Sequence, residues 1–491
     1  MRSYEHRAVG DAATGGVMVN AGGESPEEAL WLSFGDVVAL SGDYFRPRDS
    51  PGAGPEDQDG PSEAAVGGML FHLARIPGQA GTLAGTRDEI AGALKVMAVD
   101  ETFVDPRFEP GGQFAGFHFS PQANRSDVER AIRDRYLSLA AVNDDHFVSP
   151  GRSDAATGSG FDSAPSAYRN LHRVALEDAW ALGRHGGDLS RAMAREAAAQ
   201  HYLTDAFAAG HLRTPVAAIR RFWKARYPGF WDRLQRRVAA DTAKMLRELS
   251  WAIRAAPARL VFDRTLAELT ARTSRYPELS VGDLVARCFH DWDNIHGLEV
   301  DGGGVVFGDG HIDEGVTTEL ALAAVKAGND DVEAAFELGA SGGGARGEVL
   351  YAAVREATGA SGDAFRAEAM IPRPVSANPT QNWQAKDVES LWDSPMVGTK
   401  GTRVGEALVA MLDPGEQFIR QLDGLGQGLA GTHGVFGLPL LGSWLAQKCC
   451  QAYHDGFVDP LARDPQPVLL AVVHGAGEES GGPRPVAKPS P

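Results

Sequence analysis

The most constraining feature of the sequence is the segment HYLTDAFAAGH, which runs from His201 to His211. It ends an alanine-rich stretch that begins near Asp188 and is typical of a helix. Residues four positions apart share one face of a helix, so His201 and Asp205 are expected to point at one centre. Gly210 offers a break that would let the chain turn and present His211 beside them. Imidazole and carboxylate groups suit Zn²⁺, and the alternative is an ordinary buried helix with hydrogen-bonded His residues.

Composition narrows the classes of function. The chain has 491 residues, enough for one large domain or two ordinary ones. Its net charge of −18 argues against a general nucleic-acid binder or a polybasic membrane anchor, although local patches can oppose that charge. The three cysteines, Cys288, Cys449 and Cys450, provide neither a disulfide framework nor a cysteine zinc site. A zinc site here would therefore use His and carboxylate ligands.

The distribution of helix signals predicts a mostly α-helical protein with long loops. Ser25 is a predicted N-cap for a helix to about Leu40, and Gly186 is expected to end a helix that begins near Ser166. Asp188 then starts the helix that carries the central segment. Strand signals are few and short. Further helical patterns cover residues 87–98, 232–256, 314–338, 344–357 and 402–456.

The central segment resembles the signature of the zinc-dependent phospholipase C and S1/P1 nuclease superfamily. In that signature a helix reads His-Tyr-x-Gly/Thr-Asp, and a second His follows six residues after the Asp. The residues that match are His201, Tyr202, Thr204, Asp205 and His211. The sequence departs from the pattern at Phe207 and Ala209, and the downstream Asn is missing. The resemblance implies an all-α, phospholipase C/P1 nuclease-like helical fold, with insertions and a C-terminal helical extension, around two to three Zn²⁺ ions.

Upstream residues resemble further ligands of that superfamily. His146 lies in a His-Phe segment, and Asp43 lies in an Asp-Tyr segment after an expected helix. Asp43 is implied as a zinc ligand and as a general base, with Asp36 as the alternative. His6 resembles the N-terminal His ligand of the family, and we expect the Met1 amine or a water to take the role of the family's N-terminal amine.

Downstream, residues 289–296 form a dense His/Asp cluster. His290 is the candidate ligand, and Asn294 stands at the four-residue spacing where the family has a carboxylate. Asp291 or Asp293 could substitute for that carboxylate, and His296 is less favoured. Asp309 or His311, in a glycine-rich turn, could lie near the site. The implied metal ligands are His6, Asp43, His146, His201, Asp205, His211, His290 and Asn294, with Asp43 and Asp205 also catalytic.

The resemblance also suggests how the chain is divided. Residues 1–45 would form the N-terminal part of the metal-binding core and residues 141–340 the catalytic helical core. Residues 46–140 would be an insertion, residues 341–475 a C-terminal helical extension and residues 476–491 a disordered tail.

The activity implied by the resemblance is hydrolysis of a phosphodiester, most favourably of phospholipids by a phospholipase C. A P1-like single-strand nuclease and a helical scaffold with a degenerate metal site are the alternatives. Residues 220–227 are basic and aromatic, which fits either contact with an anionic membrane surface or, more favoured, an amphipathic helix with a solvated face. Neither a signal peptide nor a transmembrane helix is visible, which predicts a cytoplasmic protein or export by a signal-independent route. His172 and His185 lack metal-like spacing and are expected to be structural or surface residues.

Overall fold

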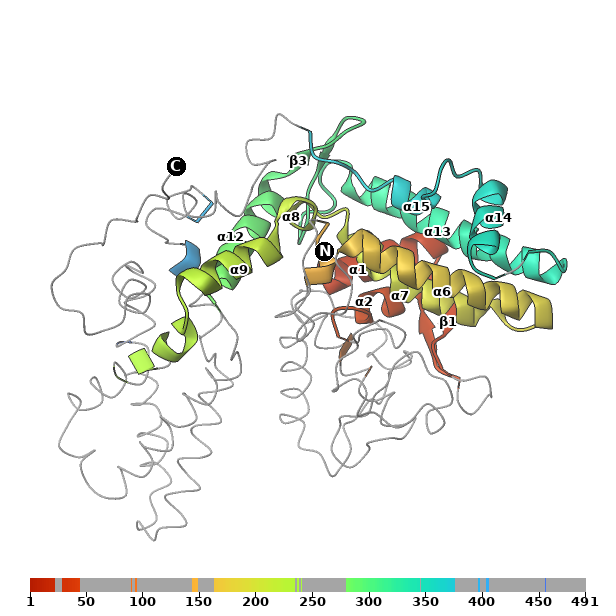
Figure 1. Ribbon diagram of the computed structural model, residues 1–491, viewed down its shortest axis with the longest axis horizontal. Helices are drawn as coiled ribbons and strands as arrows, with labels where there is room; N and C mark the ends of the chain where they lie inside the picture. The colour runs from red at the N-terminus through yellow and green to blue at the C-terminus, as the bar shows by residue number, and fades with distance from the viewer. Residues whose placement is uncertain are drawn as a thin grey trace, which may run out of the picture. The chain divides into compact units, whose positions relative to one another are not determined.

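The computed structural model describes the N-terminal residues, two long helical regions and several short pieces between them (Figure 1). The described residues are 1–22, 29–44, 90, 93–94, 144–148, 163–234, 236–237, 240, 280–344, 346–375, 396–397, 403–405 and 455. These residues are mostly helical and confirm the predicted all-α class. The predicted helices at 87–98, 232–256 and 402–456, the insertion at 46–140 and the tail at 476–491 lie wholly or mostly outside them.

The helices follow one another with two short strand pairs between them. The helices are α1 (Ser3–Thr14), α2 (Phe34–Leu40), η3 (Asp144–His146), α6 (Ala164–His185), α7 (Leu189–Asp205), α8 (Ala209–Arg213), α9 (Val216–Arg226), α12 (Val281–His296), α13 (Thr317–Ala340), α14 (Glu348–Thr358) and α15 (Arg366–Ala369). Strand β1 (Met18–Asn20) pairs antiparallel with β2 (Trp31–Ser33), and β3 (Leu298–Glu299) pairs antiparallel with β4 (Val305–Val306). No helix of the described residues is both long and apolar enough to cross a membrane.

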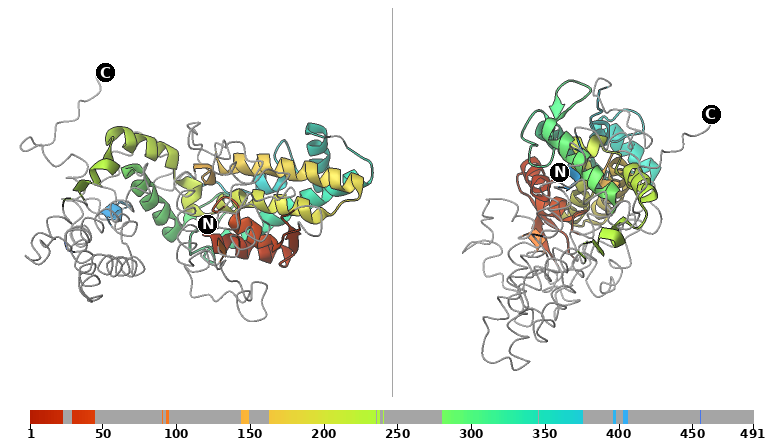
Figure 2. Two further views of the ribbon diagram at one scale, coloured as in Figure 1. Left: turned by 90° about the horizontal axis from the view of Figure 1, so that it is seen from below. Right: turned by 90° about the vertical axis from the view of Figure 1, so that its left-hand side faces the viewer.

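The helices α6, α7 and α13 pack against one another and form the centre of the core (Figures 1 and 2). Small residues on these helices let their backbones approach closely. An ideal Cβ at Gly183 of α6 would lie 2.1 Å from the carbonyl oxygen of Phe336, and one at Gly339 of α13 would lie 2.0 Å from that of Trp180. A larger side chain at either crossing would force the two helices apart.

The short helices α1 and α2 pack against each other and against α7, and α1 also contacts α13 (Figure 2). This packing brings the N-terminal residues and the loop after α2 to the C-terminal end of α7. Chain segments separated by more than 150 residues therefore meet around the central segment.

Most helix boundaries near the centre agree with the sequence. Helix α6 ends at Gly186, which has the left-handed φ of +71° that favours glycine, and Asp188 caps α7 by accepting a hydrogen bond from the Ser190 N–H. The predicted helix from Ser25 to about Leu40 is wrong over residues 29–33, and Ser25 itself lies outside the described residues. Trp31–Ser33 pairs with β1 instead, and a reciprocal cap between Ser33 and Asp36 begins α2.

The chain divides into two compact units. One contains residues 1–218 and 289–383, and the other contains residues 219–288 and 384–491. The predicted core 141–340 therefore contributes residues to both units. In the second unit, Arg220 Nε lies 2.7 Å from Asp283 Oδ1, Trp223 is buried, and Lys224 is exposed. The basic and aromatic run thus belongs to a helix with a solvated face.

Candidate metal centre

Two ligand candidates come from the last turn of α7. His201 Nε2 lies 3.4 Å from Asp205 Oδ2, as the four-residue spacing predicts. The helix ends at Asp205, and the chain runs through residues 206–208 before α8 begins. The break therefore precedes Gly210, which lies inside α8, and the prediction that Gly210 itself makes the break is wrong. His211 still returns to the end of α7, with Nδ1 3.0 Å from Asp205 Oδ1.

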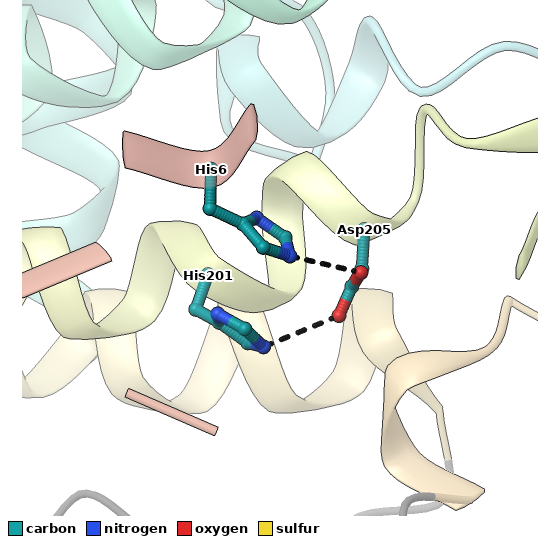
Figure 3. Close-up of side chains that lie close together, drawn as sticks. All are labelled: His6, His201 and Asp205. Carbon is teal, nitrogen blue, oxygen red and sulfur yellow. Dashed lines mark ion pairs between the residues drawn. The ribbon is translucent and has the colours of Figure 1, made fainter. Parts of the chain in front are cut away.

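Asp205 is the hub of the site (Figure 3). Its Oδ1 lies 3.3 Å from His6 Nε2, and its Oδ2 lies 2.7 Å from His146 Nδ1. The side chain is only 1% exposed. Burial alone would raise the pKa of this carboxyl, but the surrounding His211, the Met1 amine, His6 and His146 hold it well below its usual range. Asp205 is therefore an ionised carboxylate that can contact two neighbouring ions.

The loop after α2 brings Asp43 to the same place. Its Oδ1 lies 3.9 Å from His201 Nε2, and Ser3 Oγ donates a hydrogen bond to its Oδ2. Gly42, at φ +82°, makes this approach possible, since an ideal Cβ there would lie 2.5 Å from His201 Nε2. Burial raises the pKa of Asp43 above its usual value. Asp36, the alternative, does not join the site, because it caps α2 and pairs with Arg7.

A third set of donors lies beside His211. It consists of His211, His290 of α12 and Asp309, with His290 Nε2 3.5 Å from Asp309 Oδ2. Burial would raise the pKa of Asp309, but the Met1 amine, His290 and His211 lower it far below its usual value. The sequence identified Asp309 only as a residue that could lie near the site. The chain brings it there through the loop that packs against α1, where the Gly310 N–H donates to Glu5 Oε1.

Asn294 contacts His290 but has a different principal partner. Its Oδ1 accepts a hydrogen bond of 2.6 Å from the Gly210 N–H, and its Nδ2 lies 3.1 Å from His290 Nε2. An ideal Cβ on Gly210 or Gly308 would lie within 2.8 Å of that Oδ1. The amide of Asn294 thus fills the space between two glycines and anchors the start of α8. The carboxylate of the donor set with His211 and His290 comes from Asp309 instead.

The other candidates from the cluster on α12 lie outside the donor sets. Asp293 forms a buried ion pair with Arg213, and Asp291 Oδ1 lies 2.9 Å from the outward Nδ1 of His290. His296, at the exposed end of α12, donates from Nδ1 to the Trp292 carbonyl oxygen. His311 pairs with Glu314 at 2.8 Å and is 36% exposed. The sequence could not separate Asp291, Asp293 and His296 from His290, because their environment depends on which side of α12 faces α8.

Three donor sets emerge, and within each set the candidate ligand atoms lie within 4.8 Å of one another. They are His6, His201 and Asp205; Asp43, His146 and His201; and His211, His290 and Asp309. We call these eight residues the His-rich centre. The Met1 amine also reaches it, 2.7 Å from Asp205 Oδ1 and 3.4 Å from Asp309 Oδ1. Burial lowers the pKa of this amine, but Asp205 and Asp309 raise it to about 11 overall.

The Nδ1 atoms of His201 and His211 are held by hydrogen bonds to backbone carbonyls, and Nδ1 of His211 also lies 3.0 Å from Asp205 Oδ1. His201 Nδ1 lies 2.9 Å from the Val38 carbonyl oxygen, and His211 Nδ1 lies 3.0 Å from the His146 carbonyl oxygen. A carbonyl can only accept, so both rings carry their proton on Nδ1 and keep the Nε2 lone pair for a ligand. This arrangement is typical of metal-binding His residues.

The titration of His201 and His211 agrees with that assignment, whereas the pKa values of His146 and His290 shift in the opposite direction. Burial, His6 and His146 hold the pKa of His201 well below its usual value, and burial lowers the pKa of His211 to about 4. Burial lowers the pKa of His146 and His290 as well, but Asp205 and Asp309 respectively raise them overall. Neutral imidazole is the form that binds a metal.

The donor set fits Zn²⁺ by its chemistry. Imidazole nitrogens and carboxylate oxygens are the ligands that zinc takes when cysteine is absent. Three buried atoms of the centre, His6 Nε2, Asp205 Oδ2 and Asp309 Oδ1, make only the ion-pair contacts given above and no further hydrogen bond within the described parts of the chain. Buried polar atoms of this kind cost free energy unless a partner satisfies them, and a cation would satisfy all three.

Another buried His lies apart from this centre. His172 Nδ1 is 2.6 Å from Glu196 Oε2, and its Nε2 is 3.6 Å from Asp331 Oδ2. All three side chains are fully buried, so His172 is a structural residue and not a surface one, and we call this set the core triad. Burial lowers the pKa of His172, but Glu196 and Asp331 raise it to about 9. His185 is exposed at the end of α6.

Comparison of the chain with models of known families, with curated proteins and with solved structures finds no match. The class of this site therefore depends on its own geometry. That geometry is a largely buried group of five His residues and three carboxylates, arranged in three adjoining donor sets.

Proposed function

We propose that this protein is a zinc-dependent phosphodiester hydrolase whose substrates are phospholipids, as in a phospholipase C. The observation that carries the proposal is that the three donor sets adjoin. His201 belongs to two of them, and the two oxygens of Asp205 face different His residues. Clustered ions suit the two non-bridging oxygens and the leaving oxygen of a phosphodiester better than an isolated ion does.

The protein residues have separate roles in this proposal. Zn²⁺ ions, when bound, supply the charge that offsets the diester and lower the pKa of a bound water. Asp205 orients the His ligands from the end of α7. Asp43, 17% exposed, is the most accessible of the carboxylates near His201, and its raised pKa suits a group that accepts a proton from water. Asp309 takes the ligand role that the sequence suggested for Asn294.

The substrate class is inferred from the resemblance in the central segment. Its His-Tyr-x-Thr-Asp sequence is more similar to that of the phospholipase branch than to that of the nuclease branch. A P1-like nuclease is the alternative within the same chemistry. Cytoplasmic location, or export by a signal-independent route, with contact at a phospholipid surface, completes the proposal. Fractionation of the producing cells tests the location.

The test begins with zinc. The purified protein should contain more than one equivalent of zinc by elemental mass spectrometry, and chelation should remove both zinc and activity. Asp205→Asn is the matched loss variant, and His185→Ala is the control on an exposed His. A fully active protein without zinc would contradict the metal chemistry, and a zinc-free inactive protein would favour the scaffold alternative.

Parallel assays then separate the substrates. The zinc-loaded protein is given phospholipid liposomes, a soluble choline phosphodiester and single-stranded DNA. Release of a phosphorylated head group from liposomes is the expected result. Intact liposomes beside rapid cleavage of the soluble diester would exclude the phospholipase assignment, and preferential cleavage of DNA would favour the nuclease.

A further inference from the structure

The hydroxyl of Thr204 contacts the centre without belonging to any donor set. Thr204 lies on α7 between His201 and Asp205 and is fully buried. Its Oγ1 lies 2.6 Å from Nδ1 of His6, which comes from α1. The same Oγ1 lies 2.7 Å from the Gln200 carbonyl oxygen and 2.9 Å from that of His201.

The two carbonyl contacts indicate the direction of these hydrogen bonds. A hydroxyl has one proton, and the two helix carbonyls can only accept, so Thr204 donates to the helix backbone. Its lone pair then accepts a hydrogen bond from His6, which places the imidazole proton on Nδ1. The Nε2 lone pair faces Asp205 Oδ1 at 3.3 Å.

The opposite tautomer would harm metal binding. With its proton on Nε2, His6 would donate to Asp205 and present no lone pair to the centre. Without the Thr204 hydroxyl, the Nε2–H tautomer becomes more stable relative to the Nδ1–H tautomer. A buried Nδ1–H would lose its acceptor, while Asp205 remains available to Nε2–H. The hydroxyl therefore selects the form of His6 that can bind an ion.

From this geometry we infer that Thr204 is a positioning residue that fixes the tautomer of His6 for the ion shared by His6, His201 and Asp205. The inference rests on the proposed zinc-dependent function. His201 and His211 are held by backbone carbonyls, which substitution does not remove, and Asp291 beside His290 is 47% exposed. Thr204 is thus a buried side-chain partner that belongs to no donor set and that substitution can remove.

The experiment compares near-isosteric variants at two buried threonines. Thr204→Val removes the hydroxyl and keeps the shape, and Thr204→Ser keeps the hydroxyl. Thr214→Val is the matched control, because Thr214 is 1% exposed and its Oγ1 has no hydrogen-bond partner within the described residues. Zinc affinity is measured by competition of the apoprotein with a chromophoric chelator.

We expect Thr204→Val to weaken one zinc equivalent by about 10- to 100-fold, the usual effect of losing a partner behind a metal-binding His. Thr204→Ser and Thr214→Val should bind zinc as the wild type does. Ring ¹⁵N chemical shifts of His6 in the zinc-free protein should show Nδ1–H in the wild type and a shift toward Nε2–H in Thr204→Val. A merely structural role would lower the unfolding temperature without changing this tautomer.

Wild-type zinc affinity for every equivalent in Thr204→Val, or an unchanged His6 tautomer, would overturn the inference. If Thr204→Val fails to fold, Thr204→Ala tests the same hydrogen bond. A wild-type protein that binds no zinc would contradict the proposed function, and the tautomer measurement would still decide whether Thr204 orients His6.

Discussion

The His-rich centre and the core triad are both largely buried in the same unit, and each combines His and carboxylate side chains, one of the carboxylates coming from α7. In the core triad one imidazole lies between two carboxylates, and the pKa of His172 rises to about 9 because Glu196 and Asp331 outweigh its burial. In the His-rich centre the imidazoles outnumber the carboxylates. Burial and neighbouring rings there lower the pKa of His201 well below its usual value and that of His211 to about 4.

The ratio of imidazole to carboxylate explains the difference. Where carboxylates are in excess, a proton is the cation that compensates them, and the His becomes part of an ion pair. Where imidazoles are in excess, they cannot all be protonated in a dry site, so the rings with lowered pKa values, His201 and His211, keep a lone pair available to a metal. The two regions therefore predict opposite responses to substitution and to metal removal.

The largest expected effect comes from Asp205→Asn. The loss of the hub carboxylate should release zinc and lower phosphodiesterase turnover about 1,000-fold, because metal-based stabilisation of this reaction amounts to several kcal/mol. Glu196→Gln, on the same helix in the core triad, should keep the zinc. Elemental analysis and initial rates check both variants. Equal zinc loss in the two variants would contradict the assignment of zinc binding to the His-rich centre and not to the core triad.

Substitution of single His residues should separate the regions next. His201→Ala and His146→Ala should lose zinc and most activity, though less than Asp205→Asn. His172→Ala should stay near neutral in turnover and keep its zinc, but it should lose about 3–5 kcal/mol of stability, because two buried carboxylates lose their partner. Loss of turnover in His172→Ala with a fully active His146→Ala would place the active centre at the core triad.

Stability against pH offers a test of the core triad alone. The folded-state pKa of His172, about 9, lies above the ordinary value of 6.5, so the stabilisation is complete below pH 6.5 and is lost as the pH rises through about 9. A shift of this size corresponds to roughly 3 kcal/mol. Denaturant unfolding of the zinc-loaded wild type and of His172→Gln, compared between pH 6 and pH 10, should show this slope in the wild type only.

The smallest expected effect tests the third donor set. Asp309→Asn should weaken one zinc equivalent by about 100-fold, since an amide oxygen replaces an ionised ligand. Asp291→Asn should change the affinity far less, because Asp291 is 47% exposed and an amide oxygen still accepts from His290. Chelator competition measures both. A larger loss in Asp291→Asn would show that the carboxylate of this set had been misidentified.

The sequence by itself determined the local parts of this protein. The caps at Asp188 and Gly186 and the alanine-rich pattern predict α6 and α7, and the four-residue spacing predicts that His201 and Asp205 face one centre. These features depend on residues within one or two helical turns, so a single helix suffices to specify them. The resemblance added His6, Asp43, His146 and His290, which the structure gathers into the donor sets.

Only the tertiary structure decided the long-range parts. Asp309 supplies a carboxylate and Asn294 anchors Gly210 because the packing of α1, α8 and α12 brings these segments together. The hydrogen bond from His6 to Thr204 joins residues 198 positions apart. The spacing of residues in the sequence does not predict such long-range contacts. They depend on how the core of α6, α7 and α13 packs and on the loops that follow it. The choice between the His-rich centre and the core triad likewise depends on which charges the fold brings together.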